Sequence, residues 1–187
     1  MYRLTEREQN LRRRVGTIQR ILGSMRAKEL PVAVRDVPTA GMQRIFAAFD
    51  KNYVNGSYDE WIFRTNIRRI YASYYERWQP DDAPHRWVLE RAYLSVRLAG
   101  HPGEDPMSLV CIHCDPLDRT YAYPRVKQGP HLHVDCAEDP LPHCHFALNY
   151  CHLTDTLKSV DSLGQALMSL VDMLANELRH HYETLLA

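Results

Sequence analysis

Hydrophobic residues recur at two different spacings along this chain, and the spacing changes near residue 85. Between residues 3 and 28, apolar side chains follow one another at steps of three, four or seven, which is the spacing of one face of an α-helix. These positions are Leu4, Leu11, Val15, Ile18, Leu22 and Met25. From residue 86 to residue 98 the apolar residues alternate with other residues, which predicts a β-strand. The pattern therefore predicts helices first and a sheet afterwards.

Three helices are predicted in the first half of the chain. Thr5 and Glu8 form a capping box, which satisfies free backbone donors at a helix start, and the first helix is expected to continue to about residue 28. A second helix is predicted from residue 40 to residue 53. A third is predicted from residue 57 to residue 78, and its aromatic residues fall at helical spacing: Trp61, Phe63, Tyr71, Tyr74, Tyr75 and Trp78.

About five strands and a last helix are predicted in the second half. The strands cover residues 86–98, 107–114 and 120–127 and two short histidine-containing segments. Because their connections are short, the strands should form an antiparallel meander. A final amphipathic helix is expected over roughly Val160–Leu186.

We therefore predict an α+β fold. It comprises three N-terminal helices, a roughly five-stranded antiparallel meander sheet and one C-terminal helix, which packs on the sheet or against the first helix. Residues 1–85 are predicted to be a helical basic region, and residues 86–187 to carry the sheet and the last helix. The two regions are expected to form one compact unit.

Composition narrows the class of protein without naming a function. Hydrophobic residues make up 45% of the chain and charged residues 25%, which is typical of a soluble globular protein. No apolar run approaches the ~18 residues of a membrane span. The first residues lack the apolar stretch of a signal peptide, so we expect a cytoplasmic protein without membrane contact. An odd number of cysteines, five, argues against a secreted disulfide framework.

Charge is unevenly distributed although the net charge is zero. Residues 1–30 carry eight Lys and Arg against three Asp and Glu, whereas residues 101–187 carry five against twelve. Such a division is typical either of a basic region that faces nucleic acid or of two ends that neutralise each other in the fold. For the first interpretation, the candidate nucleic-acid contacts are Arg12, Arg13, Arg20, Arg64 and Arg68.

The strongest chemical signal is a pair of His-x-His segments, His131-Leu132-His133 and His143-Cys144-His145. Alternate side chains of a strand point to the same face. Each histidine pair therefore shares a face, and Asp135 shares that of the first pair. If the two strands pair, four imidazoles gather on one surface of the sheet, at a cross-strand spacing of roughly 5 Å.

This histidine face permits three interpretations. It can bind a divalent metal such as zinc or manganese through His131, His133, His143 and His145, with Asp135 as a ligand or an orienting group. Without a metal, two imidazoles can act as base and acid in phosphodiester cleavage, with Arg125 or Lys127 stabilising the transition state. It can also be a polar sheet surface without chemistry.

A Cys-x-x-Cys motif offers a second candidate metal site. Cys111 and Cys114 have the spacing of half a structural zinc site, and Cys136 and Cys144 could complete it. Cysteines in a strand are also commonly buried without any such role. No phosphate-binding glycine loop, G-x-S-x-G elbow or H-E-x-x-H motif is present, which argues against nucleotide hydrolases and serine hydrolases.

The C-terminal part of the chain resembles the TumE family, which are toxins of bacterial toxin–antitoxin systems. The resemblance lies in Tyr121-Ala122-Tyr123-Pro124-Arg125, in Gly129-Pro130-His131, and in Pro142-His143-Cys144-His145 followed by an acidic helix. It implies a toxin or phage-defence setting and a function tied to nucleic acid. It also implies that His131, His143 and His145 belong to the site.

Two functions are predicted from these features. The first is a toxin–antitoxin or phage-defence protein that acts on nucleic acid through the histidine face, as a histidine- or metal-dependent nuclease. The alternative is a non-enzymatic adaptor or antitoxin-like subunit, in which the apolar positions of Leu4–Met25 bind a protein partner or a second copy of the chain. The choice between RNA and DNA stays open.

Overall fold

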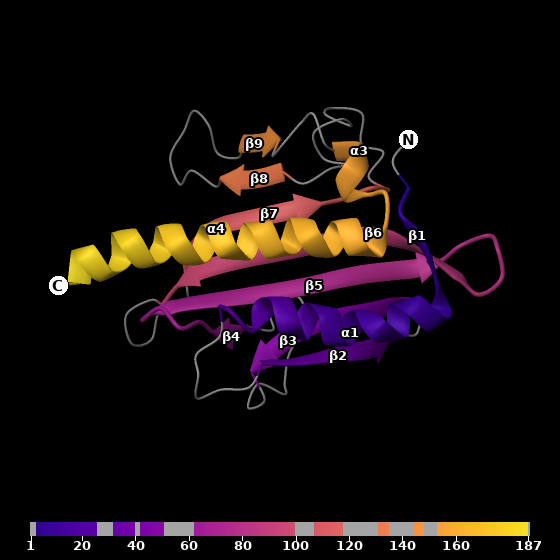
Figure 1. Cartoon of the computed structure of the whole chain (residues 1–187), viewed down its shortest axis with the longest axis horizontal. Helices are drawn as coiled ribbons and strands as arrows, with labels where there is room; N and C mark the ends of the chain where they lie inside the picture. Colours follow the sequence, from indigo (N-terminus) through magenta and orange to yellow (C-terminus); the bar gives the residue numbers. More distant parts are fainter. Residues whose placement is uncertain are drawn as a thin grey trace.

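The protein is built on one antiparallel sheet with helices on one of its faces (Figure 1). The computed structural model describes residues 3–25, 32–39, 42–50, 62–99, 107–117, 131–134, 144–147 and 153–186. Two long helices, α1 (Glu8–Leu22) and α4 (Val160–Leu186), cross the same side of the sheet. A short helix, α3 (Leu153–Thr156), precedes α4. The first and last described helices thus cover one face together.

Nine strands are described, and they pair antiparallel throughout. They are β1 (Thr5–Arg7), β2 (Val32–Pro38), β3 (Arg44–Asp50), β4 (Phe63–Arg64), β5 (Ile70–Pro80), β6 (Arg86–Leu98), β7 (Met107–Cys114), β8 (His131–Val134) and β9 (Cys144–Ala147). Their order across the sheet is β2-β3-β5-β6-β7-β8-β9, with β1 also paired to β6 and β4 to β5. Strands β5 and β6 are the longest and form its centre.

The predicted fold class is wrong in the first half of the chain. Residues 44–50, expected within the second helix, form strand β3, and residues 63–64 and 70–78, expected within the third, belong to strands β4 and β5. Both faces of β3 and β5 are covered, so apolar residues do not alternate cleanly with polar ones. In β3, for example, Ile45, Phe46, Ala47 and Ala48 are all buried. Continuous burial of this kind hides the two-residue period of a strand.

Strand β5 has a second feature that hides its period. Its tyrosines and tryptophan happen to fall at three- and four-residue steps, although aromatic residues favour strands. In the structure Ala72, Tyr74, Glu76 and Trp78 lie on one side of the strand and are buried. A glutamate at the centre of that buried row breaks the apolar alternation by which a strand is recognised.

The second half agrees better with the prediction. Strands β6, β7 and β8 and helix α4 lie where they were expected, and β8 pairs antiparallel with β9. The strand predicted at 120–127 lies outside the described residues. Helix α1 begins at Glu8, because Thr5 belongs to β1 and its hydroxyl accepts a hydrogen bond from Arg86. The predicted capping box is therefore not formed.

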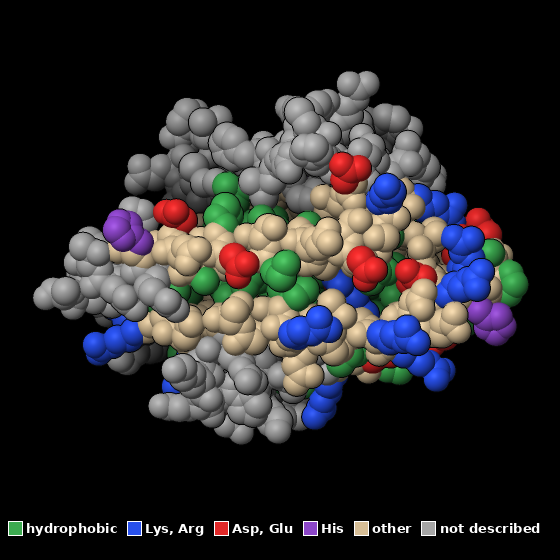
Figure 2. Space-filling model, viewed as in Figure 1, with side chains coloured by type: hydrophobic (Ala, Val, Ile, Leu, Met, Phe, Trp, Pro, Cys, Tyr) green, Lys and Arg blue, Asp and Glu red, His purple; other side chains and the backbone are tan. Residues whose placement is uncertain are grey.

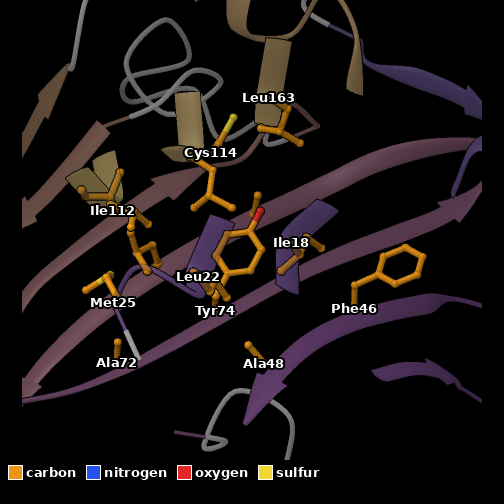
Figure 3. Close-up of a cluster of buried hydrophobic side chains, with 14 of the residues drawn as sticks. Ile18, Leu22, Met25, Phe46, Ala48, Ala72, Tyr74, Ile112, Cys114 and Leu163 are labelled. Atoms are coloured by element: carbon orange, nitrogen blue, oxygen red, sulfur yellow. The ribbon is translucent and has the colours of Figure 1, made fainter. Parts of the chain in front are cut away.

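The hydrophobic core lies between the two helices and the sheet (Figure 3). Side chains from α1, α4 and the central strands meet there, among them Ile18, Leu22, Phe46, Tyr74, Ile112, Cys114 and Leu163. The apolar positions of Leu4–Met25 are part of it, since Leu4, Leu11, Ile18, Leu22 and Met25 are each 0–1% exposed. Their contacts are satisfied inside the chain.

A buried ion pair ties both helices to the central strand. Arg14 of α1 and Glu76 of β5 are both almost completely buried, and Nε of Arg14 lies 3.0 and 3.1 Å from the two carboxylate oxygens. The same carboxylate accepts hydrogen bonds from the Tyr74 hydroxyl and from Trp78 Nε1. Arg14 also donates to the backbone oxygen of Val160, at the start of α4. Burial alone would lower the pKa of Arg14, but the charge of Glu76 raises it, so the guanidinium stays charged.

Opposite charges lie side by side on the outer surfaces of the two helices (Figure 2). Arg12, Arg13 and Arg20 are exposed on α1, whereas Asp161, Asp172 and Glu177 are exposed on the neighbouring α4. This arrangement supports the interpretation that the basic and acidic ends neutralise each other in the fold. None of the helices in the described residues is long and apolar enough to span a membrane.

Candidate metal centre

The face of the sheet that points away from the helices carries a row of ring-bearing side chains. Cross-strand register places Tyr75 of β5 opposite Tyr93 of β6, Tyr93 opposite His113 of β7, and His113 opposite His131 of β8. Residues directly opposite each other in antiparallel strands present their side chains to the same face. The row therefore crosses four strands without interruption.

A second row runs beside the first one. Register places Ser95 of β6 opposite Cys111 of β7, Cys111 opposite His133 of β8, and His133 opposite His145 of β9. His133 follows His131 by two residues, so both lie on the same face of β8. The intervening Leu132 packs against the core on the other face.

Three imidazoles converge where these rows meet. Each of His113, His131 and His133 offers a ring nitrogen, and these atoms all lie within 4.8 Å of one another. Nε2 of His131 lies 2.9 Å from Nε2 of His133, and the rings of His113 and His133 have centroids 3.8 Å apart. His131 is completely buried, whereas His113 and His133 are partly exposed. The group is thus closed on one side and open to solvent on the other.

His113 is positioned by Tyr93, which is in turn hydrogen-bonded to Asp115. The Tyr93 ring stacks on the His113 ring, with centroids 3.6 Å apart and an angle of 7° between the planes. Its hydroxyl donates a hydrogen bond of 2.9 Å to Asp115. Burial, with the adjacent carboxylate of Asp115, raises the pKa of Tyr93 far above its usual value. Tyr93 therefore remains a neutral phenol that positions the imidazole.

The structure brings together only part of the predicted histidine face. His131 and His133 share a face, as their spacing predicts. The backbone of His145 lies opposite that of His133 in β9, and its side chain lies outside the description. The remaining predicted residues, His143, Asp135, Arg125 and Lys127, lie outside the described residues.

The alternative cysteine site needs a correction. Cys111 and Cys114 are three residues apart in one strand, so they lie on opposite faces of β7. Cys114 is buried in the core beneath α4, and burial raises its pKa well above that of an ordinary thiol. Cys111 lies on the histidine face, where Sγ is 2.7 Å from Nε2 of His113. The two thiols therefore do not form half a zinc site. Cys136 lies outside the described residues, as does the side chain of Cys144.

His113 is the member of the group that sequence reasoning missed. In the sequence it lies inside the Cys-x-x-Cys motif, between Ile112 and Cys114. The signal that could have found it is alternation, because His113 follows Cys111 by two residues in a strand that was correctly predicted. Its position opposite His131 depends on a register across a long connection, which sequence spacing does not provide.

The arginines predicted to contact nucleic acid do not surround this group. Arg12, Arg13 and Arg20 lie on α1, on the other face of the sheet. Arg64 and Arg68 are exposed at β4 and in the turn that follows it. On the strand beside the histidine rows, the guanidinium carbon of Arg91 lies 5.6 Å from the centroid of the Tyr93 ring, and Arg77 is the cross-strand neighbour of Arg91.

Comparison with known proteins does not assign this chain to a family. The chain matches no family model, no curated protein and no solved structure. The resemblance to the TumE toxins therefore stays a prediction, and the three-histidine group carries the functional argument.

Proposed function

We propose that this protein is a metal-dependent hydrolase whose metal ion is held by His113, His131 and His133. The observation that supports the proposal is the convergence of three imidazole nitrogens within 4.8 Å of one another, contributed by two neighbouring strands. Three histidines with one remaining coordination position form a common catalytic zinc site. The open side of the group, at His113 and His133, provides that position.

Zinc fits this donor set better than manganese does. Imidazole nitrogen is a good ligand for zinc, whereas manganese prefers carboxylates and water. In a tetrahedral zinc site with Zn–N distances of about 2.0–2.1 Å, neighbouring nitrogens lie roughly 3.3 Å apart. The His131 and His133 nitrogens at 2.9 Å are close to this spacing, whereas separations of up to 4.8 Å within the group would have to shorten when a metal binds. Burial of His131 disfavours the protonated imidazole, and the neutral imidazole is the form that binds a metal.

The proposed reaction is hydrolysis of a phosphodiester in nucleic acid. A zinc ion of this kind lowers the pKa of its bound water to about 7 and so supplies hydroxide at neutral pH. A zinc ion held by the three histidines would make this water the nucleophile: its oxygen would replace one nucleoside oxygen on phosphorus, and the leaving oxygen would take a proton from water. Arg91 lies beside Tyr93 in the neighbouring strand, where its charge is partly neutralised by Glu90. The toxin or phage-defence role that the TumE resemblance implies would follow from such cleavage.

Cys111 supports a second candidate, a structural zinc site. Its sulfur is near enough to His113 for a thiolate to act as a fourth ligand. A site with three histidines and one cysteine would be closed to water and would stabilise the β7–β8 pair rather than catalyse a reaction. This candidate agrees with a non-enzymatic adaptor. The apolar positions of Leu4–Met25 do not offer such an adaptor a binding surface, because they are buried in the core.

Zinc binding tests the proposal directly. Protein prepared without a histidine tag and stripped with a chelator should bind one zinc ion per chain in a competition titration. His113→Ala and His133→Ala should each weaken binding by at least about a hundredfold. His180→Ala, on the exposed surface of α4, is the matched control and should bind zinc like the native chain. Failure of the native chain to bind stoichiometric zinc would exclude the metal centre.

Cobalt substitution and cleavage assays separate the two candidates. An open site gives cobalt spectra without a thiolate-to-metal band and cleaves single-stranded RNA or DNA oligonucleotides. A closed site shows that band, loses it in Cys111→Ser and cleaves nothing. Cleavage that continues in excess chelator would instead indicate metal-free acid–base catalysis by the same histidines.

A further inference from the structure

A basic depression lies at the end of the molecule where α1 begins, away from the histidine group. It has a volume of about 590 Å³, and its lining includes Arg7, Arg12, His85 and Arg86 together with one carboxylate, that of Glu8. These residues come from β1, the first turns of α1, the β5–β6 turn and the start of β6. Figure 2 shows basic side chains gathered at this end of the molecule. A cavity of this size holds a small organic ligand.

Two of these arginines face each other in the sheet. Register places Arg7 of β1 directly opposite Arg86 of β6, and like charges in this position repel each other. The same sheet contains a second such pair, Arg77 and Arg91. There a bulge places Glu90 between the two guanidinium groups, and its carboxylate pairs with both. The protein thus supplies its own anion to one arginine pair.

The carboxylates near Arg7 and Arg86 do not bridge the two arginines. Glu8 pairs with Arg44 and, at 3.6 Å, with Arg12, and it accepts a hydrogen bond from Trp87. Asp81 pairs with Arg3 and, at 3.9 Å, with Arg86. Among the described residues, the Arg7 guanidinium has no ion-pair partner. Arg7 and Arg86 therefore lack the bridging carboxylate that Arg77 and Arg91 have.

The turn that carries His85 is held in an unfavourable conformation. His85 has φ of 58°, in the left-handed region that side chains other than glycine rarely adopt. Its backbone oxygen accepts a hydrogen bond from the backbone N–H of Glu8, which holds this turn against the start of α1. Strain of this kind is maintained at ligand sites more often than elsewhere.

We propose that this depression binds the phosphate group of a nucleotide, free or at the end of a strand. The phosphate takes the place that Glu90 has at the other arginine pair: it accepts charge-assisted hydrogen bonds from Arg7 and Arg86 and relieves their repulsion. Arg12 and His85 supply further donors at the rim. The site is independent of the metal centre, because it lies on other strands and needs no metal.

Calorimetric titration in excess chelator tests the site with the metal centre empty. Adenosine 5′-monophosphate and a 5′-phosphorylated trinucleotide are the two probes, and adenosine and the unphosphorylated trinucleotide are their controls. We expect the phosphorylated probe of at least one pair to bind saturably and its control not to bind. Arg7→Gln or Arg86→Gln should each weaken binding by about tenfold or more. Arg13→Gln and Arg20→Gln, exposed on the same helix but outside the depression, should leave it unchanged.

Melting temperature provides a second readout that does not require binding to be strong. Because Arg7 and Arg86 repel each other, Arg7→Gln should raise the melting temperature of the protein without nucleotide. Added nucleotide should raise the melting temperature of the native chain but not that of the Arg7→Gln variant. Equal binding of adenosine and its monophosphate would overturn the proposal. So would an equal loss of affinity in the Arg13 and Arg20 variants, or no saturable binding of either phosphorylated probe at millimolar concentration. None of these results would bear on zinc binding at the histidine group.

Discussion

Single residues determine both the stability and the chemistry of this protein. Glu76 is the clearest case, since one buried carboxylate accepts hydrogen bonds from Arg14, Tyr74 and Trp78. Such a group costs free energy to bury and is tolerated only because all of its partners are present. His113 is the comparable case at the candidate metal centre, where its side chain adds a third imidazole to the pair formed by His131 and His133.

Glu76→Gln should destabilise the protein by about 3–5 kcal/mol, because it leaves the buried charge of Arg14 without a counter-charge. Urea unfolding at neutral pH measures the change. The double variant Arg14→Met with Glu76→Leu should recover a large part of this loss, since neither charge is then buried. Asp172→Asn, on the exposed surface of α4, is the control and should change stability by less than about 0.5 kcal/mol. A Glu76→Gln variant as stable as this control would contradict the role of the pair.

The elements were predictable where a strand has one apolar and one polar face. Strands β6 and β7 and helix α4 were found from their periodicity. Strand β3 was missed because it is buried on both faces, and β5 because a glutamate lies within its buried row. The shared face of His131 and His133 could be predicted, because the two residues are two positions apart in one strand, β8. The contribution of His113 could not, because it depends on how β7 pairs with β8.

Helix α1 is fixed to the sheet through Glu8, which predicts a dependence on pH. Burial alone would raise the pKa of Glu8, but hydrogen bonds from Arg44 and Trp87 and nearby positive charge outweigh it and lower the pKa below 4.5. A carboxylate with a lowered pKa stabilises the fold above its unfolded-state pKa, and this contribution is lost as the pH falls through the folded-state value.

Glu8→Gln should therefore lower the free energy of unfolding by about 1 kcal/mol at pH 7. The difference between the variant and the native chain should shrink as the pH falls below 4.5. Urea unfolding at several pH values measures it, and the fluorescence of Trp87, whose Nε1 donates to Glu8, reports the local change. A difference that stays constant from pH 7 to pH 3 would show that the charge of Glu8 is not involved.

At the scale of the whole molecule, the two predicted regions share one sheet. The boundary near residue 85 falls in the turn between β5 and β6, whose strands pair along the full 11 residues of β5. Neither region contains a complete core, since α1 belongs to the first and α4 to the second, and both cover the same central strands.

Fragments 1–85 and 86–187 should consequently fail to fold when they are produced separately. Each would expose a long unpaired strand edge and half of the core, which favours aggregation. Circular dichroism and thermal melting should show no cooperative transition for either fragment, whereas refolding them together should restore one. A cooperative transition in fragment 86–187 alone would identify it as an independent domain.

The contact of Arg14 with the backbone of Val160 also has a consequence for synthesis on the ribosome. Synthesis begins at the N-terminal end, so α1 and the described strands are made before α4. Until α4 is available, the apolar side of the sheet lacks part of its cover, and Arg14 lacks one of its acceptors. The core around Arg14 can therefore close only after α4 has been made. A premature stop before α4 would release a product that chaperones retain and proteases remove.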